Sequence, residues 1–90
     1  MFGFDLGIDL GTSSLVIAMP GKGIVLNEPS YIAYSVEDEK MIYAGKRAYY
    51  LQGREPQGVR VAQPLKDGVI GSYKLTEKML SFFMDKVIGK

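Results

Sequence analysis

Three short apolar segments separated by turn residues begin this chain and constrain its fold more than any other feature. From residue 4 to 10, apolar and polar side chains alternate, which is the period of a strand with one buried face. A continuous apolar run follows over residues 15–19, and another strand pattern over 23–27 comes after the turn dipeptide Pro20-Gly21. We therefore expect a three-stranded antiparallel meander.

Shorter β patterns and one helical pattern fill the middle of the chain. Residues 31–36 and 41–44 predict a second, smaller hairpin around a charged turn. Residues 46–52 predict a helix of about two turns, which Gly53 ends. Residues 58–63 alternate and predict another extended segment.

The last part of the chain predicts a turn and then one long amphipathic helix. Residues 64–68 have turn chemistry, and a short extended pair, Val69-Ile70, follows them. We expect the helix over residues 75–88, after Lys74, with Gly89 as a left-handed C-cap. Its apolar residues recur at helical spacing: Met79, Leu80, Phe83, Met84, Val87 and Ile88.

Composition excludes several classes of function. The 90 residues contain no Cys and no His, which excludes disulfides, thiolate or imidazole catalysis and most zinc sites. The formal net charge is +1 and the basic residues are dispersed, so we expect no nucleic-acid partner. The absence of Cys is compatible with an intracellular location. No apolar run approaches the ~20 residues of a membrane span, and we expect neither a span nor a signal peptide.

The segment Asp9-Leu10-Gly11-Thr12-Ser13-Ser14 is the candidate binding motif. A phosphate requires several converging donors, which a tight turn supplies through backbone N–H groups and hydroxyls where a glycine lets the ligand approach. Asp9 at the end of the strand would hold a hydrated Mg²⁺. The alternative is a plain hairpin turn whose polar side chains only satisfy local backbone groups. Neither a P-loop nor a G-x-G-x-x-G pattern occurs.

Two segments resemble the MreB-like proteins of the actin-like ATPase superfamily. They are "GIDLGTSSLVIAMPGKGIVLNEPSYIAY", residues 7–34, and "PLKDGVIGSYKLTEKML", residues 64–80. The resemblance implies an α/β class, here an α+β part of a ribonuclease-H-like first domain with a three-stranded meander, a small β-rich insert and one long helix. Residues 1–31 and 70–90 would belong to subdomain IA and residues 32–69 to subdomain IB, with the second domain outside this chain.

The resemblance also implies a function and a site. In full length, such a protein binds ATP and Mg²⁺, forms membrane-associated filaments on the cytoplasmic face of the inner membrane, and controls cell shape together with cell-wall synthesis proteins. The residues that it places at the phosphates are Gly11, Thr12, Ser13, Ser14 and Leu15, with Asp9 toward Mg²⁺ through water. Residues 13–15 depart from the family's usual Ala-Asn and then often Thr, and Lys74 stands where the family often has an acidic helix cap.

Two further expectations concern what these 90 residues lack by comparison with the family. The second phosphate loop, the adenosine pocket and the acidic residue that positions water are absent, so we expect no ATP hydrolysis by this chain alone. The strand over residues 4–10 would keep an unpaired edge, which favours self-association or complementation by a partner chain.

Two alternatives to the family's function remain at this point. One is a sugar kinase or an exopolyphosphatase-type hydrolase with the same turn, against which "GKGIVLNEPS" argues. The other is a small non-catalytic interaction module.

Overall fold

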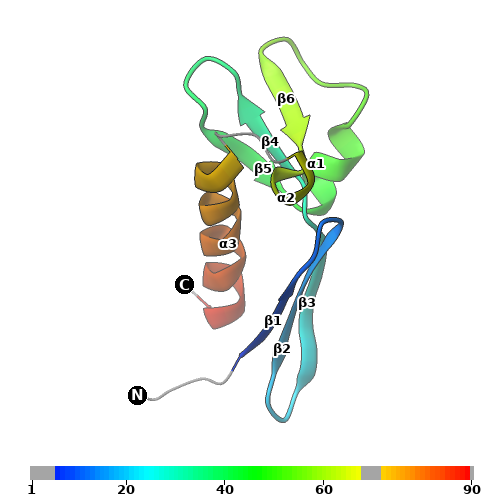
Figure 1. The fold of residues 1–90 in the computed structure, drawn as a ribbon, viewed down its shortest axis with the longest axis vertical. Helices are drawn as coiled ribbons and strands as arrows, with labels where there is room; N and C mark the ends of the chain where they lie inside the picture. The colour runs from blue at the N-terminus through cyan, green and yellow to red at the C-terminus, as the bar shows by residue number, and fades with distance from the viewer. Residues whose placement is uncertain (1–5, 68–71, 90) are drawn as a thin grey trace.

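The meander is present as the sequence predicts. The computed structural model describes residues 6–67 and 72–89 (Figure 1). Strands β1 (Gly7–Leu10), β2 (Ser14–Met19) and β3 (Gly23–Pro29) form an antiparallel sheet in the order β1-β2-β3. Residues 4–5, which we assigned to the first strand, lie outside the described residues. β3 continues beyond the predicted end at residue 27.

The register of the meander places five apolar side chains on one face, whereas Val16 lies on the other face and Ile24 and Val25 are exposed. Ile17 pairs with Ile8 on one side and with Leu26 on the other, and Leu10 pairs with Leu15. This face packs against a helix to form the core, whose buried residues are Leu15, Ile17, Leu26, Ile32, Ala44, Met79 and Phe83. The alternation in the sequence is therefore the basis of the core.

A second small sheet is formed by β4 (Ile32–Ser35), β5 (Met41–Ala44) and β6 (Val59–Ala62), in the order β5-β4-β6. Both β5 and β6 are antiparallel to β4. The predicted hairpin is the β4–β5 pair. The extended segment predicted near residue 60 is β6, which pairs with the opposite edge of β4.

Helix α1 (Lys46–Leu51) connects the two sheets through its first residues. The Lys46 N–H donates to Glu28 Oε1 of β3 at 3.0 Å. Gly45, directly before the helix, has a φ of 76°, and a Cβ there would meet the Glu28 carboxylate and lie 2.9 Å from Phe83 Cζ. Only glycine combines this backbone conformation with so close an approach.

The end of the chain differs from the prediction in two places. Residues 64–67, expected as a turn, form the short helix α2 (Pro64–Asp67); proline is favoured at the first helical position because its missing N–H has no partner there anyway. The pair Val69-Ile70 lies outside the described residues.

Helix α3 (Ser72–Ile88) begins three residues before the predicted start. Lys74 therefore lies inside its first turn rather than before the helix, so the comparison with an acidic cap does not apply. Gly89 has a φ of 91° and its N–H donates to the Asp85 carbonyl at 2.9 Å, which confirms the predicted C-cap. In Figure 1, α3 stands beside the meander, and the small sheet continues the molecule beyond the β1–β2 turn.

Candidate functional site

The turn between β1 and β2 carries the motif singled out in the sequence. Leu10 and Leu15 form the last strand pair, and the Gly11 N–H donates to the Ser14 carbonyl at 2.9 Å, which closes the turn. Thr12, Ser13 and Ser14 are exposed. The turn therefore presents three hydroxyl-bearing residues at the surface of the molecule.

Ser30, which follows β3, holds this turn from the inside. It is fully buried, and its Oγ lies 3.2 Å from the Gly11 carbonyl oxygen and 3.1 Å from the Thr12 carbonyl oxygen. The Ser30 N–H donates to the Ser13 carbonyl at 3.0 Å. One residue thus contacts three successive carbonyls of the turn.

Gln63 reaches the same turn from the small sheet. It follows β6, and its Nε2 donates to the Thr12 carbonyl at 3.3 Å, across 51 positions of sequence. Our sequence interpretation included neither Gln63 nor Ser30. For Ser30 the available signal was a hydroxyl directly after Pro29; for Gln63 there was none, because only the fold brings it to the turn.

These contacts decide which way the peptide groups of the turn face. The C=O and N–H of a trans peptide point in opposite directions. Because the carbonyls of Gly11 and Thr12 face Ser30 and Gln63, the N–H groups of Thr12 and Ser13 face the other way. Within residues 6–67 and 72–89 neither N–H has an acceptor. Backbone N–H groups exposed in this way are a common means of binding anions.

Gly11 contributes space rather than an unusual backbone conformation. Its φ is not positive, and a Cβ added to it would lie 3.4 Å from the Ser14 carbonyl oxygen, an ordinary contact. The fold would therefore accept alanine here. What a Cβ would take up is room that a ligand approaching the backbone could use.

Asp9 is exposed on β1, opposite Val16. Side chains alternate along a strand, so Asp9 lies on the face away from Ile8 and Leu10, and hence away from α3. Among the residues described, no three acidic side chains come together as a metal site. A single carboxylate nevertheless fits Mg²⁺ that is held mainly by waters and phosphates.

Leu15 differs from the other predicted site residues. Its side chain is fully buried in the core, so only its backbone is available near the turn. Asp9 and the segment from Gly11 to Ser14 thus lie at the same end of the β1–β2 hairpin, whereas the Leu15 side chain lies in the core.

The acidic turn between β4 and β5 is a separate feature. Asp38 Oδ1 accepts the Lys40 N–H at 3.2 Å, and this hydrogen bond, helped by one from Ser35, lowers the pKa of Asp38. The neighbouring residues Glu37 and Glu39 are exposed. The turn is therefore a solvated hairpin tip, as the sequence predicts.

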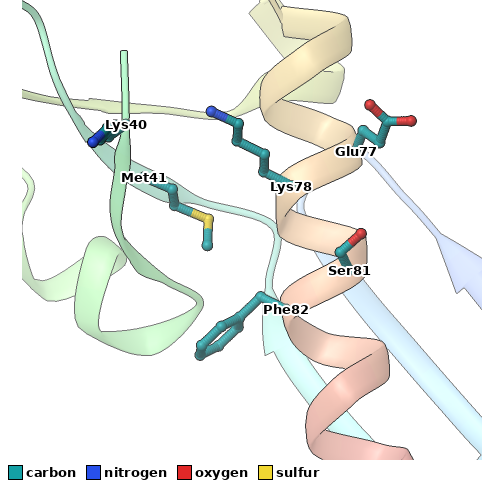
Figure 2. A pocket seen from close by; sticks show the side chains of 6 residues that line it. All are labelled: Lys40, Met41, Glu77, Lys78, Ser81 and Phe82. Carbon is teal, nitrogen blue, oxygen red and sulfur yellow. The ribbon is translucent and has the colours of Figure 1, made fainter. Parts of the chain in front are cut away.

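An open groove of about 520 Å³ lies between β5 and α3 (Figure 2). Its lining residues are Lys40, Met41, Glu77, Lys78, Ser81 and Phe82. Met41 and Phe82 point into the space between the two elements, and the Lys40 and Lys78 side chains lie above them in Figure 2. None of the lining residues belongs to the β1–β2 turn, so the groove is not part of the candidate phosphate site.

No helix in the part of the chain that the structure describes is both long enough and apolar enough to cross a membrane.

Comparison with known proteins assigns the chain to a family. A family model described as "MreB/Mbl protein" matches residues 3–90. The chain is 46% identical over 87 residues to the cell shape-determining protein Mbl of Bacillus subtilis, covering 97% of this chain and 26% of that protein. It is 42% identical over 91 residues to the cell shape-determining protein MreB of Escherichia coli K12, with the same coverage of both.

Solved structures agree with this assignment. MreB5 of Spiroplasma citri bound to ADP superposes with a TM-score of 0.79 at 33% identity, covering 91% of this chain and 25% of that one. The same protein bound to AMPPNP gives a TM-score of 0.73 at 36% identity, covering 84% and 23%. The chain spans about a quarter of the length of these relatives.

The matches extend over almost the whole chain. Their sequence identities of 33–46% are high enough to show a common family and not only a common fold. They separate it from the sugar kinases and exopolyphosphatase-type hydrolases that the turn alone left open. The chain belongs to the MreB/Mbl family of actin-like, cell shape-determining proteins.

Proposed function

We propose that the β1–β2 turn of this chain binds the phosphates of Mg-ATP in an actin-like ATPase that determines cell shape. The observation that carries the proposal is the orientation of the turn, in which Ser30 and Gln63 hold the carbonyls and the N–H groups of Thr12 and Ser13 have no acceptor among the described residues. The relatives of known structure that were solved with ADP and AMPPNP support a nucleotide as the ligand.

Each residue of the site has a proposed role. The backbone N–H groups and hydroxyls of Thr12, Ser13 and Ser14 donate to phosphate oxygens, and Gly11 leaves room for them. At Leu15 only the backbone contributes. Asp9 orients a water bound to Mg²⁺, and the metal ion, when bound, neutralises phosphate charge.

The wider activity belongs to the longer protein. Residues 1–31 and 70–90 are assigned to subdomain IA and residues 32–69 to subdomain IB of the first domain. ATP hydrolysis requires groups on both sides of the nucleotide, so we assign it to the two-domain protein and not to these 90 residues. The family membership is the support for this division.

The proposed partners follow from the same membership. They are further copies of the protein in filaments, the inner face of the cell membrane and proteins of cell-wall synthesis. In the described part of the chain β1 pairs with β2 alone. Its outer edge is therefore available to another strand of the protein or of a second copy.

Titration of the intact gene product with Mg-ATP tests the proposal. Thr12→Ala should weaken binding by about tenfold or more, because a hydrogen bond to a charged group is lost. Thr12 is exposed, so the melting temperature without nucleotide should change little.

Ser81→Ala removes a hydroxyl from an exposed position on α3 and serves as the control, with unchanged affinity expected. A wild-type protein that binds no Mg-ATP would contradict the proposal. So would a Thr12→Ala variant with the affinity of the wild type.

A further inference from the structure

We propose that Ser30 and Gln63 are positioning residues for the nucleotide, which hold the β1–β2 turn in the conformation that exposes its N–H groups to phosphate. This role rests on the proposed function. Neither residue needs to touch the ligand, since both act through the carbonyls of the turn.

Ser30 forms hydrogen bonds with two neighbouring peptide groups of the turn, so a substitution of its side chain would remove both bonds. Its single hydroxyl hydrogen is shared between the Gly11 and Thr12 carbonyls, at 3.2 and 3.1 Å, and the side chain is fully buried. Without it, the Gly11 carbonyl would lose its side-chain donor in a partly buried setting, and the Thr12 carbonyl would keep only the donor of Gln63, which is unfavourable. Rotation of the peptide would relieve this by turning the carbonyl outward and the N–H inward.

Rotation of the peptide between Gly11 and Thr12 would change ψ of Gly11 and φ of Thr12. Gly11 adapts readily because it has no Cβ, whereas the β-branched Thr12 opposes a positive φ. A turn that needs glycine for close approach of a ligand therefore also needs anchors for its carbonyls. The Ser30 hydroxyl supplies one anchor from the end of β3.

Gln63 supplies the second anchor. Its effect on nucleotide binding can be measured separately from its effect on the stability of the fold. It is half-buried, and its 3.3 Å bond to the Thr12 carbonyl lies near solvent, so removal of the donor leaves a carbonyl that water can reach. The free energy of unfolding should change little. The orientation of the Thr12–Ser13 peptide should change, and with it the fraction of molecules competent to bind.

The affinity for nucleotide depends on the fraction of molecules whose turn has the binding conformation. When only part of the population has the binding conformation, the apparent dissociation constant rises in inverse proportion to that part. Loss of one neutral hydrogen bond corresponds to a change of about three- to tenfold. We expect this change for Mg-ATP with Gln63→Met, which keeps the length of the side chain and removes the donor.

The experiment compares four variants of the intact gene product by calorimetric titration with Mg-ATP and by thermal melting without nucleotide. Gln63→Met should bind about three- to tenfold more weakly, with a melting temperature within about 3 °C of wild type. Gln63→Lys restores a donor of similar reach and should recover much of the affinity. Gln57→Met, the same substitution at an exposed position before β6, should behave as wild type. Ser30→Ala should lose affinity and also melt earlier.

The outcomes separate this inference from the function on which it rests. Wild-type affinity in Gln63→Met, in a protein that does bind Mg-ATP, overturns the positioning role and leaves the proposed function intact. Equal losses in Gln63→Met and Gln63→Lys also overturn it, since the donor would then be irrelevant. If the wild type binds no Mg-ATP, both proposals fail. If Ser30→Ala does not fold, the Gln63 variants decide the question.

Discussion

At the scale of single residues, two glycines of this chain differ in whether the fold requires them. Gly45 has a positive φ and no room for a Cβ beside Glu28 and Phe83, so the fold requires it. Gly11 has an ordinary φ and would accept a Cβ at contact distance, so the fold does not. A glycine that the fold can spare, in a turn with exposed N–H groups, indicates a position kept open for a ligand.

Gly11→Ala should therefore separate stability from binding. We expect the free energy of unfolding to change by no more than about 0.5 kcal/mol, because no strained backbone or severe contact is involved. Affinity for Mg-ATP should fall, since the Cβ occupies space next to the phosphates. Urea denaturation and nucleotide titration of the same preparation measure the two quantities. An unaltered affinity would argue against close approach of phosphate at Gly11.

At the scale of elements, periodicity predicted most of the fold. The alternation in residues 4–10 predicts a strand with one buried face, and the helical spacing around Phe83 predicts a helix with one buried face. In the structure the two faces pack against the same core. The sequence does not distinguish α2 from a turn, because Pro64 fits a turn as well as the first position of a helix. The sequence does not predict the start of α3 at Ser72, because the apolar spacing begins only one turn later.

The candidate site was predictable only in part. Its ligand-facing half is continuous in sequence, from Asp9 to Ser14, and has a recognisable composition. Its supporting half is not, because Ser30 and Gln63 lie 18 and 51 positions from Thr12 and reach it only once both sheets have formed. No local pattern contains such information, and composition gives no reason to select these two residues among other polar ones.

The packing of α3 can be tested with two neighbouring phenylalanines. Phe83 is fully buried, whereas Phe82 is 43% exposed beside the groove. We expect Phe83→Ala to lower the free energy of unfolding by about 3–5 kcal/mol through loss of burial and the cavity left behind. Phe82→Ala should cost clearly less, because much of its ring is already in contact with water. Similar losses in the two variants, measured by urea denaturation, would contradict the placement of α3 on the meander.

At the scale of the whole molecule, the two sheets are joined where β3 meets α1. The Glu28 carboxylate accepts the Lys46 N–H, and Gly45 packs directly against that carboxylate and Phe83. The joint therefore brings together the meander, the start of α1 and the helix that covers the core. A change there should affect the attachment of the small sheet as well as the total stability.

Gly45→Ala tests this joint. A side chain at this φ of 76° and ψ of −137° costs about 1–3 kcal/mol, and the forced displacement of Glu28 or Phe83 adds about 1–3 kcal/mol. Gly53→Ala is the matched control, because Gly53 has a φ of 86° but no atom within 4 Å of an added Cβ. The control should show the backbone cost alone. Equal destabilisation in thermal melts of both variants would show that contact at the joint is unimportant.

The anchoring of the turn through its carbonyls has a consequence for how such a site evolves. Ser30 and Gln63 bind main-chain atoms that every residue possesses, so the shape of the turn is encoded outside the turn itself. Side chains at residues 13 and 14 can then be exchanged without rebuilding the scaffold. Ser13 and Ser14 could in this way stand where the resemblance to the family implies Ala-Asn. The side chains of the turn can therefore vary while its backbone conformation is kept. Residues that determine this conformation should be sought first among those that bind its carbonyls.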